Sequence, residues 1–154
     1  MKIAVFPGSF NPITNGHIAI LKRAINFFDK IIVLVAVNPE KDVTSSLKER
    51  VECIKEAVAN IPNIEVDYTD GLTVEYAKKH KASCLIRGLR NEQDFEFETE
   101  LMIANKILDP SIETMFFIAD EQYTQVSSTR VRELIQSGQD ISKLVPKSII
   151  GKLK

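Results

Sequence analysis

Short apolar runs alternate five times with longer amphipathic segments, and this alternation limits the possible folds more than any other feature of the chain. The expected strands cover 3–6, 31–37, 64–68, 83–87 and 114–119. The expected helices cover about 16–28, 46–58, 73–80, 93–108 and 127–137, with a short helix over 146–154. Such alternation predicts an open parallel sheet covered on both faces, with right-handed crossovers. We therefore predict an α/β, Rossmann-like, doubly wound fold with a five-stranded parallel sheet, in a single domain over residues 1–154.

The first two helices carry clear apolar stripes. The first stripe consists of Ile18, Leu21, Ile25 and Phe28, and the second of Leu47, Val51, Ile54 and Val58. Ser46 and Glu49 resemble a capping box, so we expect the second helix to begin there.

Composition narrows the class of protein and of partner. The chain has 154 residues, of which 44% are hydrophobic, and its net charge of −1 gives no general attraction to nucleic acids or membranes. Cys53 and Cys84 lack metal-site or CxxC spacing and are expected to be reduced, buried thiols. No apolar run reaches the ~20 residues that span a bilayer. A strand that begins at Lys2 leaves no room for a signal peptide, so the cytoplasm is the expected compartment.

The segment between the first strand and the first helix has features of a phosphate site. A helix N-terminus offers unpaired N–H groups and a positive dipole end. Gly16 would let a ligand approach the backbone, His17 would project towards the same phosphate, and Ser9 would add a hydroxyl. A capped helix start with an incidental histidine accounts for the same residues, and neither a Walker A loop nor a GxGxxG pattern is present.

Two further junctions carry groups that suit anions. Arg87 ends the fourth strand and Arg90 follows it, and a guanidinium can bind a phosphate through two parallel hydrogen bonds. Ser127 to Thr129 begin a helix after the fifth strand and can cap it or donate to an anion. Lys41 is a third basic group, in the loop after the second strand. Solvated surface positions for the two arginines and for Lys41, and simple helix capping by Ser127 to Thr129, remain alternatives. Because ligands bind at the carboxyl ends of parallel strands, we expect these groups at one edge of the sheet.

Three motifs give the sequence a family resemblance. Gly8 to His17 resembles the (H/T)xGH signature of the nucleotidylyltransferase superfamily, and Val126 to Arg132 resembles its Ser-Ser-Thr signature. The segment from Arg87 to Glu98 is similar to that of the bacterial phosphopantetheine adenylyltransferases. The resemblance covers essentially the whole chain and implies a nucleotidyltransferase fold that acts in coenzyme A biosynthesis.

The resemblance also implies roles for individual residues. His17 would stabilise the transition state at the α-phosphate of ATP. The implied contacts with 4′-phosphopantetheine come from Ser9, Lys41, Thr73 and Arg87. The implied contacts with ATP come from Ser9, Phe10, His17, Gly88, Leu89, Arg90, Glu98, Tyr123, Thr124, Gln125, Val126, Ser127, Ser128 and Thr129. Magnesium as cofactor, a homohexamer and feedback binding of coenzyme A follow from the same resemblance.

The expected reaction is direct attack by the phosphate of 4′-phosphopantetheine on the α-phosphorus of ATP, without a covalent enzyme intermediate. A phosphate is largely ionised near neutral pH, so positioning and charge stabilisation would suffice. The sequence departs from the family pattern at Asn11, where an aspartate is usual, at Phe6, and in the acidic neighbours of Lys41.

Three alternative functions stay open at this point. A sister enzyme would act on nicotinate mononucleotide or a polyol phosphate, although the segment 87–98 disfavours it. An ATP-binding sensor would bind ATP without turnover. A flavodoxin-like domain would bind a yellow cofactor and would not need His17 or Arg87.

Overall fold

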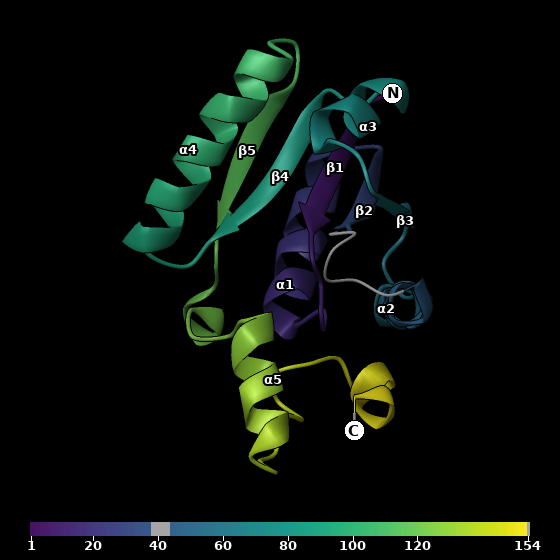
Figure 1. Cartoon of the computed structure of the whole chain (residues 1–154), viewed down its shortest axis with the longest axis vertical. Helices are drawn as coiled ribbons and strands as arrows, with labels where there is room; N and C mark the ends of the chain where they lie inside the picture. Colours follow the sequence, from purple (N-terminus) through teal and green to yellow (C-terminus); the bar gives the residue numbers. More distant parts are fainter. Residues whose placement is uncertain (38–43, 154) are drawn as a thin grey trace.

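Five strands form a single parallel sheet in the order β3-β2-β1-β4-β5 (Figure 1). The strands are β1 (Ile3–Gly8), β2 (Lys30–Ala36), β3 (Ile64–Thr69), β4 (Cys84–Leu89) and β5 (Glu113–Ile118). The computed structural model describes residues 1–37 and 44–153. From β1 the chain adds β2 and β3 on one side of the sheet, and it then returns to add β4 and β5 on the other side. The strand order thus reverses between β1 and β4, and folds of this type bind ligands at such a point. The predicted doubly wound parallel sheet is confirmed.

The helices follow the predicted order with three corrections at their ends. They are α1 (Asn15–Ala24), α2 (Thr44–Ala57), α3 (Thr73–Lys79), α4 (Glu92–Leu108) and α5 (Ser128–Gln136), with 3-10 turns η1 (Ile25–Phe27), η2 (Glu121–Tyr123) and η3 (Lys147–Lys152). The first helix, expected over about 16–28, ends at Ala24 and continues as a 3-10 turn. Ser46 lies inside the first turn of α2, so its predicted cap is wrong, because a Ser-x-x-Glu spacing also fits within a helix. The C-terminal helix is a 3-10 helix preceded by Pro146, a form that short segments favour.

Successive side chains of each strand point to opposite faces of the sheet, and an apolar layer covers each face. One layer joins Phe6 and Val33 to the apolar stripes of α1 and α2, to Val131 of α5 and to the C-terminal residues. The other joins Val5 and Leu34 to α3. This period of two follows from the pleat of a strand and needs both faces of the sheet to be covered. Cys53 and Cys84 are both free and buried, as predicted.

Helix α4 does not share this packing. Glu98 is the only side chain that it buries, although the helix has 17 residues. Its exposed apolar side chains are Phe95, Phe97, Leu101, Ile103, Ile107 and Leu108, and Met115 and Ile118 of β5 are exposed beside them. None of the described helices combines the length and the apolar character that a membrane crossing requires.

Candidate active site

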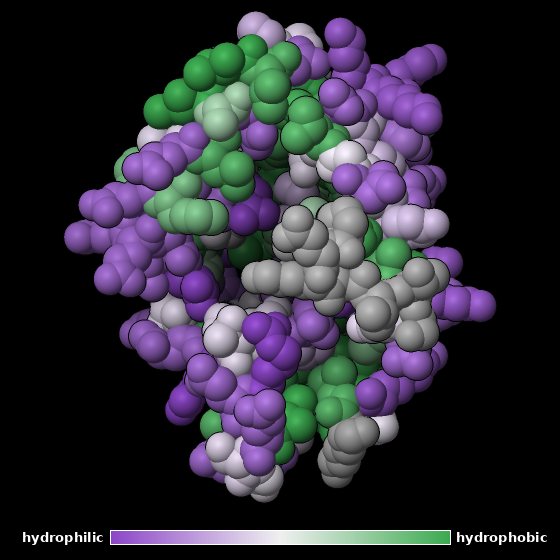
Figure 2. Space-filling model, in the orientation of Figure 1, coloured by the Kyte–Doolittle hydropathy of each residue, from purple (hydrophilic) through white to green (hydrophobic). Residues whose placement is uncertain are grey.

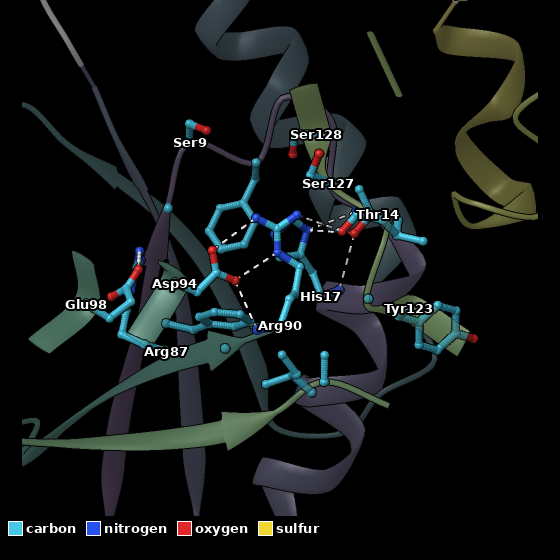
Figure 3. A pocket seen from close by; sticks show the side chains of 18 of the residues that line it. Ser9, Thr14, His17, Arg87, Arg90, Asp94, Glu98, Tyr123, Ser127 and Ser128 are labelled. Atoms are coloured by element: carbon cyan, nitrogen blue, oxygen red, sulfur yellow. Dashed lines mark hydrogen bonds and ion pairs between the residues drawn. The ribbon is translucent and has the colours of Figure 1, made fainter. Parts of the chain in front are cut away.

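Two adjoining cavities open at the carboxyl ends of β1 and β4. The first lies between the β1–α1 loop, the first turn of α1, the end of β4 and the start of α5 (Figure 3). The second extends from the same loop towards α3 and α4. Both are lined by Pro7, Gly8, Ser9, Arg87 and Glu98. Two ligands bound in these cavities would therefore meet beside the β1–α1 loop.

The structure brings most of the predicted site residues together. Those that line the first cavity are Ser9, Phe10, His17, Arg87, Gly88, Arg90, Glu98, Tyr123, Val126, Ser127 and Ser128. Thr73 lines the second cavity, as do Ser9 and Arg87. Four predicted residues line neither cavity: Leu89, Thr124, Gln125 and Thr129. Lys41 lies outside the described residues.

The spacing of Thr14 and His17 has a structural cause. Thr14 is the N-cap of α1, and its Oγ1 accepts a hydrogen bond from the backbone N–H of His17 at 3.4 Å. In return, Nδ1 of His17 accepts the backbone N–H of Thr14 at 3.0 Å. This is a capping box in which histidine takes the usual place of glutamate or glutamine. The box therefore holds the imidazole at the helix start.

The same contact fixes the tautomer of His17. A backbone amide always donates, so Nδ1 must be unprotonated and the neutral ring carries its proton on Nε2. Burial, and then the positive charges of Arg87 and Arg90, lower the pKa of His17 from 6.5 to about 4. Near neutral pH the ring is thus an uncharged hydrogen-bond donor in the cavity, suited to a developing negative charge and not to proton abstraction.

The N-terminus of α1 offers fewer donors than the sequence suggests. The backbone N–H of Asn15 donates to Leu144 O at 2.8 Å, and that of Ile18 donates to Thr14 O. The N–H of His17 is held by Thr14 Oγ1. Gly16 lines the cavity and supplies the remaining N–H of this turn. An anion here would depend on Gly16 and on Nε2 of His17.

Arg87 is held in place by a buried carboxylate. Its Nε and Nη2 donate to the two carboxylate oxygens of Glu98, at 2.6 and 2.5 Å, and its Nη1 donates to Pro7 O. A guanidinium has five N–H groups, so two of them remain for a phosphate. Glu98 therefore orients Arg87 and balances its charge, and the ATP contact implied by resemblance stays a prediction.

Arg90 has a comparable partner in Asp94. Nε and the backbone N–H of Arg90 both donate to Asp94 Oδ2 at 2.9 Å, and Nη2 donates to Oδ1. Burial raises the pKa of Asp94, but the hydrogen bonds from Arg90 outweigh it and hold this pKa below its usual range. Sequence reasoning did not single out Asp94. Arg90 precedes the N-cap Asn91 of α4, so the helical i,i+4 rule did not indicate this contact.

Side chains from distant elements bind the carbonyl groups of the β1–α1 loop. Ser128 Oγ donates to Pro12 O at 2.6 Å, Arg132 donates to Asn11 O, and Arg50 donates to Ser9 O at 3.3 Å. The buried Phe10 adopts a φ of 44°, and its ring meets that of His17 edge-on at 4.9 Å. The loop is therefore fixed from several sides. Asn11 lines neither of the two cavities, so its missing carboxylate does not alter their walls.

The hydroxyl groups at the start of α5 have structural tasks. Ser127 Oγ caps the helix by accepting the N–H of Arg130, while Ser128 holds the loop. The capping alternative considered for these residues is therefore correct for Ser127. What remains for an anion is the backbone N–H groups of the first turn.

Gly88 lies where helix and sheet approach each other closely. A Cβ at this position would lie 2.4 Å from Cδ1 of Ile20 on α1. A side chain at this position would therefore need the end of the Ile20 side chain to move.

The walls of the second cavity were missed by sequence reasoning. One face of α4 contributes Glu98, Leu101, Met102 and Asn105, which recur at helical spacing. Ala36, Leu85 and Thr114 complete the walls. The periodicity was visible in the sequence, but nothing in it indicated that this face borders a cavity.

The described residues contain no ready-made metal site. Within residues 1–37 and 44–153, no group of three or more His, Cys, Asp or Glu side chains could hold a metal ion. The two carboxylates that line the first cavity, Asp94 and Glu98, are each bound by an arginine through both oxygens.

Comparison with known proteins assigns the family. The model of the cytidylyltransferase-like family matches residues 5–134. The chain belongs to this family. Three similar members, each named phosphopantetheine adenylyltransferase, come from Caldanaerobacter subterraneus (49% identical; 99% of this chain and 96% of the relative), Clostridium botulinum strain Langeland (46%; 100% and 94%) and Shouchella clausii (42%; 100% and 97%). The resemblance predicted from the motifs is confirmed.

A solved structure supports the fold of this cytidylyltransferase-like chain. A crystal structure of a Vibrio parahaemolyticus protein assigned as a nicotinate-nucleotide adenylyltransferase superposes with a TM-score of 0.70 and covers 99% of both chains. The two sequences are 18% identical, so this likeness concerns the fold alone.

Proposed function

We propose that this chain transfers the adenylyl group of ATP to 4′-phosphopantetheine and releases dephospho-coenzyme A and pyrophosphate. The observation that carries the proposal is the pair of cavities that meet beside Ser9 and Arg87. The first has the helix termini and basic groups that suit a nucleotide. The second is lined along α4 from Glu98 to Asn105, where a flexible amide chain could lie. Relatives that match nearly the full chain are named for this reaction.

The chemistry needs no nucleophile from the protein. A phosphate oxygen of 4′-phosphopantetheine forms a bond to the α-phosphorus of ATP, and the bond from that phosphorus to the oxygen bridging to the β-phosphate breaks. Pyrophosphate leaves with the electron pair of the broken bond. The protein aligns both phosphates and stabilises the charge on the oxygens of the α-phosphorus, which is how most phosphoryl-transfer enzymes act.

The side chains divide this work. Nε2–H of His17 and N–H of Gly16 would donate to the α-phosphoryl oxygens. Arg87, oriented by Glu98, would hold the acceptor phosphate where the two cavities join. Arg90 and the first turn of α5 would hold the β- and γ-phosphates. Each role uses a group whose position the surrounding hydrogen bonds already fix, so little reorganisation accompanies the reaction.

Magnesium fits this site as a partner of ATP and not as a resident of the protein. Asp94 and Glu98 have both oxygens occupied by arginines, so phosphate oxygens and water would supply its ligands. When bound, the ion would neutralise part of the charge on the triphosphate. Asn11 in place of aspartate is consistent with a metal that the protein does not bind directly.

Assembly and regulation belong to the same proposal. Figure 2 shows a hydrophobic surface at the upper left, over α4 and β5, and the exposed Ile103, Ile107 and Ile118 belong to these elements. Such a surface is typical of a subunit interface and supports association of the chain, for which the resemblance implies a homohexamer. Coenzyme A combines a pantetheine arm with an adenine nucleotide, so it could occupy both cavities as a feedback ligand. A single catalytic domain in the cytoplasm remains the prediction.

A side-by-side acceptor assay tests the proposed function. Purified protein, ATP and magnesium are mixed with 4′-phosphopantetheine, nicotinate mononucleotide or glycerol 3-phosphate, and pyrophosphate release is measured. The proposal expects rapid release with 4′-phosphopantetheine and loss of that release in His17→Ala, which excludes a contaminating enzyme. Preference for nicotinate mononucleotide would instead support the sister enzyme. ATP binding without release with any acceptor would support a sensor.

A further inference from the structure

Asn15 is the member of the Thr14–His17 turn that does not line either cavity. Its side-chain Nδ2 donates to Lys143 O at 3.0 Å, and its backbone N–H donates to Leu144 O at 2.8 Å. Two donors of one residue thus bind two consecutive carbonyl groups, which fixes both the position and the rotation of the first turn of α1. The partners come from the opposite end of the chain.

The segment that receives these bonds is itself firmly packed. We define residues 138–153 as the C-terminal strap. Ile141, Val145 and Ile149 of the strap are buried in the same apolar layer as α1 and α2. Lys152 pairs with Glu56 of α2 at 2.6 Å. The strap is therefore a fixed support, because buried apolar side chains hold a segment far more strongly than surface contacts do.

We propose that Asn15 is a positioning residue for adenylyl transfer, which acts through His17 by holding the first turn of α1 against the C-terminal strap. This inference rests on the proposed function. His17 lies two residues after Asn15, and Nδ1 of its ring is bound by the N–H of Thr14, the residue just before Asn15. Any displacement of this turn therefore moves the backbone donor and the imidazole together. A shift of about 1 Å at a catalytic group can reduce turnover by up to a hundredfold.

Helix α1 offers a matched control at its other end. Nδ2 of Asn26 donates to Lys22 O at 3.4 Å and to Arg23 O at 3.3 Å. Asn26 lies just beyond the C-terminus of the helix and lines neither cavity. Asn15→Ala and Asn26→Ala therefore each remove an amide that donates to backbone carbonyl groups, but only the first removes a contact with the strap.

The kinetic test compares kcat and KM for ATP and for 4′-phosphopantetheine in the wild type and both variants. We expect Asn15→Ala to lower kcat about tenfold while each KM stays within about twofold, because the amide does not touch the ligands. Asn26→Ala should keep wild-type kcat. The inference is overturned if both variants have the same kcat, or if Asn15→Ala raises KM for ATP with kcat unchanged, which would make Asn15 a ligand contact.

A second readout needs no substrate and separates this inference from the proposed function. Nitrogen-15 NMR of the His17 ring distinguishes the Nε2–H tautomer from the Nδ1–H tautomer. We expect the Nε2–H form alone in the wild type and in Asn26→Ala, and a mixture in Asn15→Ala. An unchanged ring spectrum in Asn15→Ala would contradict the inference even if the wild type is inactive. An inactive wild type with the expected spectra would instead refute only the proposed function.

Discussion

His17→Gln isolates the ionisation of the imidazole from its structural contacts. Glutamine is a natural partner in a capping box, so its side-chain oxygen can still accept the backbone N–H of Thr14. The variant keeps the helix start but loses the titrating group. Any difference in pH dependence between wild type and variant then belongs to His17.

The size of the effect follows from the pKa of His17. In the folded protein this pKa is about 4, below the ordinary value of 6.5, so the unfolded chain takes up the proton first as the pH falls. His17 therefore gives its full contribution to stability above the unfolded pKa, and that contribution is lost as the pH falls towards the folded pKa. Linkage gives a loss of about 2 kcal/mol between about pH 7.5 and about pH 5. Because His17 faces an open cavity, this figure is an upper value.

Urea unfolding followed by circular dichroism measures this effect. The free energies of unfolding of wild type and His17→Gln are determined at both pH values, and the variant is expected to lose about 2 kcal/mol less than the wild type. Other titrating groups affect both proteins equally and cancel in the comparison. Equal losses in the two proteins would show that His17 titrates normally and would refute the assignment of a neutral donor held by burial.

Three further predictions concern the same cavity. His17→Ala should lower kcat by about a hundredfold or more with little change in KM, because one donor that stabilises the developing charge is lost. Steady-state kinetics measure this, and near-full turnover would refute that role of His17. Gly88→Ala should destabilise the protein by about 1–3 kcal/mol in a thermal melt, because the new Cβ meets Ile20 Cδ1. Adding Ile20→Val removes that atom and should restore most of the lost stability, and no rescue would show that this contact is not the cause. Glu98→Ala should destabilise by about 3 kcal/mol or more, since it leaves the Arg87 charge partly buried without its partner, and an unchanged melting temperature would contradict the orienting role of Glu98.

The sheet was predictable because each strand is marked locally. Ile31 to Val35 form an uninterrupted run of large aliphatic residues, and the structure buries every one of them. The helix stripes are equally local. Element ends were less predictable, because Ser46 and Glu49 fit a cap as well as a helix interior.

The anion-binding junctions were predictable as positions but not as contacts. A parallel sheet necessarily brings the loops after β1, β4 and β5 to one edge, so Ser9, Arg87 and Ser128 could be grouped from sequence. Glu98 and Asp94 each accept hydrogen bonds from an arginine. These contacts depend on how α4 packs along the end of β4, which sequence spacing alone does not determine. The contact between Asn15 and the C-terminal strap was missed for the same reason, since it joins residues 15 and 144.

The most direct test of the account is to follow the oxygen atoms of the acceptor. 4′-Phosphopantetheine whose phosphate carries heavy oxygen is incubated with ATP, magnesium and the protein, and the products are weighed by mass spectrometry. Direct attack on the α-phosphorus predicts that all of the label appears in dephospho-coenzyme A and that pyrophosphate is unlabelled. Label in pyrophosphate, or formation of ADP in its place, would contradict adenylyl transfer at this site.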